Sequence, residues 1–120
     1  MGGLLAARWW PVAALAIGMG APAMLSAAMS ADVSAEAPFL TENQTAMDKM
    51  MADMSVKPSG DVDRDFAAMM IPHHQGAIDM ARVELQYGKD PQIRKLAQDV
   101  IAAQQKEIAF MQAWQAKHAK

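Results

Sequence analysis

The chain has 120 residues, a formal net charge of −2 and 52% hydrophobic residues, and it contains no cysteine. This length allows one small domain, the mild acidity favours neither nucleic acid nor an anionic membrane surface as a partner, and disulfide bonds are excluded. A domain of this size buries only a modest core. We therefore expect a metal ion, a partner subunit or both to add stability.

The first 30 residues have the order of a secretory signal peptide. Arg8 is followed by an apolar stretch over residues 9–25 and by small residues over 26–31. A positive start, an apolar middle and a small-residue cleavage zone are typical of an export signal. The alternative is an uncleaved anchor helix, but two prolines and two glycines interrupt the run and make it a poor membrane span. We expect cleavage near Ala28 to Ala31 and a periplasmic or secreted protein.

Residues 31–40 favour a flexible leader, and a short helix is expected from Thr41 to about Met54. Thr41 begins a capping-box spacing, which is typical of a helix start. Four methionines of this helix share one face, because they stand at positions i, i+3, i+4 and i+7: Met47, Met50, Met51 and Met54. One interpretation of this face is a hydrophobic stripe that packs on the rest of the protein. The other is a Cu(I) site made of thioethers, and both uses are compatible.

Two longer helices follow. Asp61 is the expected N-cap of a helix that stops at Gly88. The pair Asp90-Pro91 supplies an N-cap and a first-turn proline for the next helix, which runs to about His118. Each helix has roughly 26 residues and a length of about 40 Å. Residues 41–120 therefore predict one all-α domain, an antiparallel helical hairpin plus a short N-terminal helix.

Polar groups interrupt the apolar faces of both hairpin helices. His73 lies within the apolar stripe of the second helix, and Gln104 and Glu107 lie within that of the third. Burying such groups without partners costs on the order of 1–3 kcal/mol for neutral ones, so we expect them to meet. Folding the hairpin about Lys89 brings them to one level. The predicted site consists of His73, His74, Met69, Met70, Met80 and Met111, with Gln104 and Glu107 beside them.

Imidazole and thioether groups suit copper, and thioethers favour Cu(I) over Cu(II). The histidines and methionines of the cluster are therefore candidate ligands. Gln104 and Glu107 would orient a histidine ring through its other nitrogen. The alternative for His73 is a core histidine that is hydrogen-bonded to Glu107 with no metal present, and the residues alone leave both interpretations open.

Two runs of this sequence closely resemble a bacterial family of unknown function with a ferritin-like helical fold. The first run, Asp65–Ala81, contains MIPHHQGAIDMA, and the second comprises 90–97 and 103–108. Because the family includes CopM-like periplasmic copper-binding proteins, the resemblance implies metal handling, with His73, His74 and the neighbouring methionines at matching positions. Longer members carry two hairpins. The resemblance therefore implies that two copies of this shorter chain form a homodimer and complete a four-helix bundle.

These observations predict an exported copper-binding protein that buffers, carries or detoxifies copper, exchanges it with a delivery or efflux partner, and is not an enzyme. Cu(I) is the favoured ion and Cu(II) the alternative. The main competing hypothesis is a structural or interaction protein whose histidines are satisfied in the core without metal. A ferritin-like di-iron or manganese oxidase is less favoured, because such sites use paired Glu-x-x-His motifs and this chain has none.

Overall fold

A computed structural model describes residues 22–119, with side chains described from Val33 onward. This part of the chain contains three α-helices and no strand: α1 (Pro22–Asp53), α2 (Val62–Tyr87) and α3 (Pro91–Lys117). The predicted all-α class is confirmed. The expected export signal over 1–30 lies largely outside the described residues. Within them, no helix is long and apolar enough to cross a membrane.

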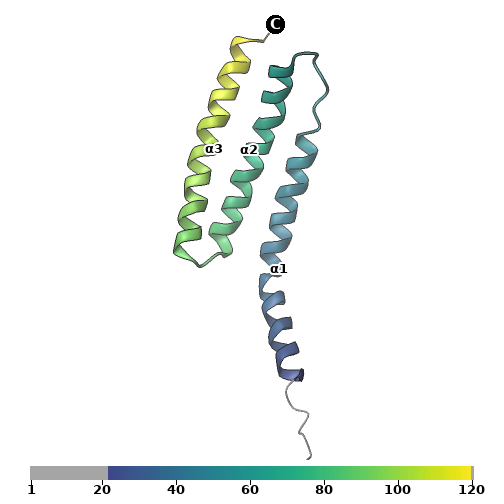
Figure 1. Cartoon of the computed structure of the whole chain (residues 1–120), viewed down its shortest axis with the longest axis vertical. Helices are drawn as coiled ribbons and strands as arrows, with labels where there is room; N and C mark the ends of the chain where they lie inside the picture. Colours follow the sequence, from purple (N-terminus) through teal and green to yellow (C-terminus); the bar gives the residue numbers. More distant parts are fainter. Residues whose placement is uncertain (1–21, 120) are drawn as a thin grey trace, which may run out of the picture.

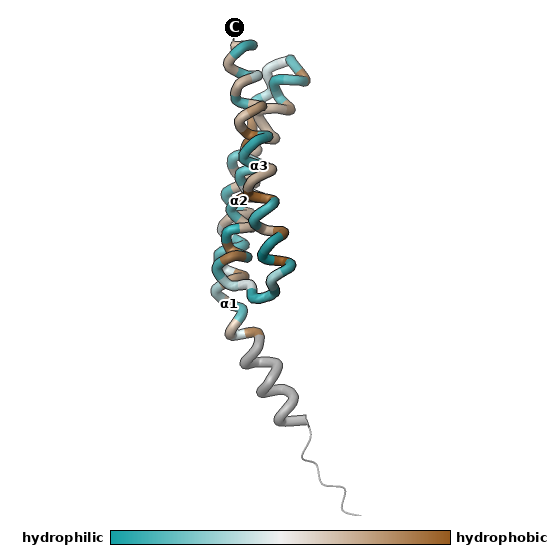
Figure 2. The backbone as a smooth tube through the Cα atoms, turned by 90° about the vertical axis from the view of Figure 1, so that its left-hand side faces the viewer, coloured by the Kyte–Doolittle hydropathy of each residue, from teal (hydrophilic) through white to brown (hydrophobic). Residues whose placement is uncertain are grey.

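The three helices lie side by side in a single layer, with α2 in the middle (Figure 1). In the described part of the chain, α2 packs against both neighbours, whereas α1 and α3 do not contact each other. Viewed from the edge of the layer, the helices project onto one another, which shows that the layer is thin (Figure 2). Successive helices run in opposite directions, so α2 is antiparallel to both α1 and α3. Within the described part of the chain, no further element covers either broad face of the layer.

The predicted hairpin of α2 and α3 is confirmed, and local capping fixes its ends. Asp61 accepts hydrogen bonds from two backbone amides at the start of α2, at 3.0 and 3.1 Å. Asp90 does the same at the start of α3, at 2.9 and 3.0 Å. Arg94 then joins the two helices, since its guanidinium donates to the carbonyl oxygens of Leu85 (2.6 Å) and Gly88 (2.9 Å). These bonds satisfy backbone groups that helix ends otherwise leave unpaired.

The expected start of the first helix at Thr41 is wrong. Helix α1 has 32 residues and passes through Thr41 and through 31–40, where the sequence favoured a flexible leader. The Thr41 hydroxyl donates to the carbonyl oxygen of Ala37 at 2.9 Å, one turn earlier, instead of capping a helix start. A threonine can bond to the backbone in either way. The capping-box spacing alone therefore cannot separate a helix start from a helix interior.

The core is small and rich in alanine. Among the described residues, the buried apolar side chains are Ala46, Ala67, Ile78, Ala81, Val83, Ala97 and Met111. The large side chains of Phe66, Leu96 and Phe110 are instead 57%, 57% and 71% exposed. Small buried residues let the helices approach closely. A single layer, however, cannot bury its larger apolar side chains, which normally pack against a second layer.

Candidate functional site

His74, not His73, meets Glu107 between α2 and α3. The Nε2 atom of His74 is hydrogen-bonded to a carboxylate oxygen of Glu107. The His74 side chain is only 15% exposed, whereas that of Glu107 is 60% exposed. His73 lies about 100° further round α2 and is exposed. The alternative interpretation of His73 as a core residue bonded to Glu107 is therefore wrong, although the level at which the two helices meet was predicted correctly.

The second ring nitrogen of His74 has an unusual environment. Its Nδ1 atom is buried, and it has no hydrogen-bond partner among the described residues. Because a carboxylate only accepts hydrogen bonds, Nε2 donates in this contact, and in the neutral ring Nδ1 then carries a lone pair. An unpaired buried polar atom costs about 1–3 kcal/mol. The His73 ring is adjacent, with its centroid 5.9 Å from that of His74.

The contact between α1 and α2 depends on Gly76 and Met50. A Cβ atom added at Gly76 would lie 2.5 Å from the sulfur of Met50 and 2.7 Å from its Cβ. Only a glycine therefore allows α1 to come this close. This contact was missed from the sequence, although an isolated glycine inside a helical pattern signals a packing reason of this kind.

The same contact sets the level of the remaining methionines. Because α1 and α2 are antiparallel and Met50 lies over Gly76, Met54 is at about the level of His73, and Met47 at about the level of Met80. Met47 and Met51 are 39% and 61% exposed. The methionine face of α1 therefore packs in part, through Met50, and remains in part accessible.

The predicted single cluster is divided among three sides of α2. His74 and Glu107 lie on the α3 side, Met50 lies on the α1 side, and His73 lies on the broad face between these two contacts. Met111 is buried near Ala67, about two helical turns from His74. It lines an open hollow of about 350 Å³ together with Asp63, Phe66, Ala67, Phe110 and Trp114. The remaining predicted residues are half-buried: Met54, Met69, Met70, Met80 and Gln104.

The described residues contain no group of three or more histidine, aspartate or glutamate side chains that could hold a metal ion. Methionine sulfur is a further kind of donor in the same region. Thioether and imidazole together are a soft donor set that suits copper.

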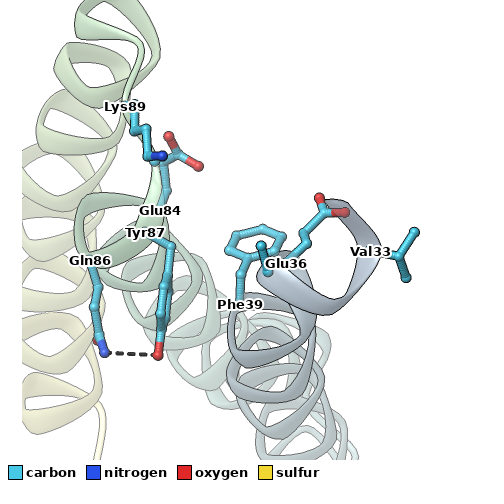
Figure 3. A pocket seen from close by; sticks show the side chains of 9 residues that line it. Val33, Glu36, Phe39, Glu84, Gln86, Tyr87 and Lys89 are labelled. Atoms are coloured by element: carbon cyan, nitrogen blue, oxygen red, sulfur yellow. Dashed lines mark hydrogen bonds between the residues drawn. The ribbon is translucent and has the colours of Figure 1, made fainter. Parts of the chain in front are cut away.

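A separate pocket of about 750 Å³ lies at the other end of the α1–α2 contact. Figure 3 shows Phe39 of α1 and Tyr87 of α2 within it, with the carboxyl groups of Glu36 and Glu84 nearby. The Tyr87 hydroxyl donates to Glu42, and this hydrogen bond raises the pKa of Tyr87 above its ordinary value. Neither histidine nor methionine lines this pocket. It is therefore distinct from the candidate copper ligands.

Comparison with known proteins gives a family but no activity. A family model described as "Domain of unknown function (DUF305)" matches residues 15–115. Uncharacterized protein L153 of Acanthamoeba polyphaga mimivirus is 45% identical over 49 residues. That alignment covers 41% of this chain and 32% of the viral protein. The chain therefore spans about a third of this curated relative.

Proposed function

This chain belongs to the family described as domain of unknown function DUF305, and we propose from its own residues that it binds copper through histidine and methionine. In this proposal it is an exported protein, periplasmic or secreted, that buffers or carries Cu(I). It binds the ion without catalysing a reaction and exchanges it with a delivery or efflux partner.

The His74 ring carries this proposal. Its Nε2 is held by Glu107, and its Nδ1 is buried without a hydrogen-bond partner among the described residues. Histidine ligands commonly donate one ring N–H to a carboxylate, which orients the ring and makes the other nitrogen more basic. A copper ion at Nδ1 would remove the cost of the unpaired atom.

The methionines between α1 and α2 support the same chemistry. Met47 and Met54 lie at about the levels of Met80 and His73, and the α1 face is partly exposed. Thioethers select Cu(I), and methionine tolerates repacking. The same face would therefore both pack on α2 and bind the ion.

Competitive titration of the full chain with Cu(I) against a coloured chelator tests this proposal. We expect Glu107→Gln to weaken copper binding about 10- to 100-fold, as loss of an orienting hydrogen bond to a ligand typically does. His74→Ala should weaken it at least as much. His118→Ala is the matched control, because this ring stacks on Trp114 (4.3 Å between centroids) and bonds to a backbone oxygen at 2.7 Å.

The control should leave copper affinity unchanged. The assignment of His74 fails if His74→Ala and His118→Ala bind copper as tightly as the unaltered chain. Thermal unfolding gives an independent readout, since a ligand specific for the folded state raises the melting temperature. A melting temperature that does not change at saturating Cu(I) would favour the competing hypothesis, a structural or interaction protein. The exposed apolar side chains favour that hypothesis as well.

The finer description of the fold is also a proposal. A ferritin-like arrangement requires a bundle of more than one layer, and a homodimer would supply the second layer. Light scattering on the full chain at micromolar concentration tests the homodimer directly. A monomeric mass would contradict it.

A further inference from the structure

One broad face of the three-helix layer carries His73 and several large exposed apolar side chains, with the carboxyl groups of Glu84 and Glu107 among them. We call it the apolar face and define it by Leu40 and Met51 of α1, Phe66 and His73 of α2, and Leu96 and Phe110 of α3. The five apolar members are each between 48% and 71% exposed. Phe66 and Phe110 line the same hollow, so these parts of α2 and α3 lie on one side of the layer.

Hydrogen bonds on the opposite side of the layer show on which face Met51 of α1 lies. Glu42 contacts Gln86 and Tyr87, which joins one edge of α1 to one edge of α2. At about 100° per residue, Met51 stands opposite Glu42, and His73 stands roughly opposite Gln86. Met51 and His73 therefore share the face that carries Phe66.

The reverse face is polar. Lys49 pairs with Asp53 there, and Arg82 pairs with Asp79 at 3.3 Å. An apolar face cannot be buried against these charges without leaving them desolvated. Among the described residues, the surface that best suits the apolar face is therefore the same face of another copy, which is the self-complementary contact of a two-fold dimer.

The dimensions fit such a contact. A layer as long as α2, which has 26 residues, with three helix axes about 9 Å apart, presents a face of roughly 1,000 Å². A stable interface needs about 800 Å² from each partner. The composition fits as well, because the large apolar side chains lie on this face while alanines fill the core. A second copy would supply the missing layer.

His73 lies near the centre of the apolar face. It is on the middle helix, and it is about equally far along the chain from Val62 and from Tyr87, the two ends of α2. When two copies cover each other's apolar faces about a two-fold axis, the central residue of each lies closest to that axis. The two His73 rings then meet, and Met70 stands one turn from each.

We propose that two copies of this chain join through the apolar face and share one copper ion, held by His73 and Met70 of both copies. Two imidazoles and two thioethers give four soft ligands, a number and type suited to Cu(I). The identity of the metal rests on the copper-binding function proposed above. The pairing of the two copies does not.

A cysteine cross-link tests the pairing without copper. The chain contains no cysteine, so His73→Cys introduces a single thiol near the proposed axis. Mild oxidation with diamide should give a covalent dimer, because a disulfide forms where two Cα atoms are about 4.4–6.8 Å apart. Arg82→Cys on the polar face is the control and should remain monomeric on a denaturing gel. Equal cross-linking of the two variants, or none with His73→Cys, overturns the proposed pairing.

Light scattering and copper counting complete the test. Phe110→Glu places a charge on the apolar face at an exposed position, and Ala109→Glu places the same charge on its exposed neighbour. We expect Phe110→Glu to be monomeric and to lose one bound Cu(I) per two chains, and Ala109→Glu to retain both properties. His73→Ala should lose the same ion and remain dimeric. A dimer with unchanged copper content in His73→Ala overturns the shared site.

The two proposals fail in different ways. If the unaltered chain is a monomer that still binds Cu(I) through His74, the shared site is wrong and the copper-binding function stands. If no variant binds Cu(I), the copper-binding function fails together with the shared site. The cross-linking result still decides the pairing in that case.

Discussion

The two contacts of the central helix differ in kind. Between α2 and α3, directional bonds hold the helices, with His74 on Glu107 and Arg94 on two carbonyl oxygens. Between α1 and α2, Gly76 has no Cβ atom, so the flexible side chain of Met50 packs directly against the backbone of α2. Directional bonds fix a register, whereas methionine contacts adapt to several arrangements.

This difference divides the roles of the helices. The α2–α3 hairpin is the rigid part, and it orients His74. Helix α1 is the more adaptable part, because the methionines of its contact face tolerate repacking. Substitutions that break one contact at a time separate the two roles.

The largest effect is expected for Gly76→Leu. A side chain at this position overlaps Met50 from its Cβ outward. Rotation of the methionine alone therefore cannot relieve the overlap, and α1 must shift. Overpacking of this kind typically costs about 1–3 kcal/mol of unfolding free energy. Urea unfolding followed by circular dichroism measures that loss, and the α2–α3 hairpin should remain helical.

Ala102→Leu is the control for Gly76→Leu, because Ala102 is exposed on α3. Surface substitutions of this kind change stability by less than about 0.5 kcal/mol. Equal stabilities for the two variants would show that α1 does not depend on close approach at Gly76.

A smaller effect is expected for Arg94→Met in the rigid contact. The substitution removes both hydrogen bonds to the end of α2, at Leu85 and Gly88, while it keeps much of the apolar stem. Hydrogen bonds from charged groups are worth about 1.5–3 kcal/mol each when buried. We expect a loss of about 1–2 kcal/mol, because Arg94 is only half-buried.

Lys95→Met provides the comparison for Arg94→Met. Lys95 pairs with Asp99 one turn away, and both side chains are more than 60% exposed. Exposed pairs of this type contribute about 0.3–0.5 kcal/mol. Thermal melts of the two variants should therefore differ clearly, and a Lys95→Met loss as large as that of Arg94→Met would contradict the assigned role of Arg94.

The rigid contact is also the one that the sequence predicts well. Asp61, Asp90 and Pro91 are local signals, because a capping side chain acts within three residues of its position. The hairpin level follows from helix geometry about the turn, so Glu107 was placed opposite the histidine pair. Choosing between His73 and His74 was beyond that reasoning, since it depends on how far each helix rotates to pack. One residue changes the direction of a side chain by about 100°.

The adaptable contact could not be predicted in the same way. The length of α1 beyond Thr41 is set by packing and by backbone bonding inside the helix, and Thr41 itself carries a signal that fits a cap and an interior equally well. The position of α1 depends on Gly76, which acts by having no side chain. The division of the predicted metal cluster among three sides of α2 follows from this, since the sequence did not show that α1 would occupy the side opposite α3.

The smallest effect concerns Tyr87, which reports on whether α1 is docked. Its hydrogen bond to Glu42 of α1 favours the protonated phenol and raises the pKa of Tyr87. The stability from this bond is therefore present below the ordinary pKa of about 10, and it is lost as the pH rises through the raised value. Tyr87 is the single tyrosine of the chain, so the ultraviolet absorbance of tyrosinate follows it alone. Glu42→Ala should return the pKa toward its ordinary value, and so should Gly76→Leu if it displaces α1. Glu36→Ala, in the same pocket, should leave the pKa raised, and an equal fall there would mean that general pocket charge, rather than the bond to Glu42, sets the pKa.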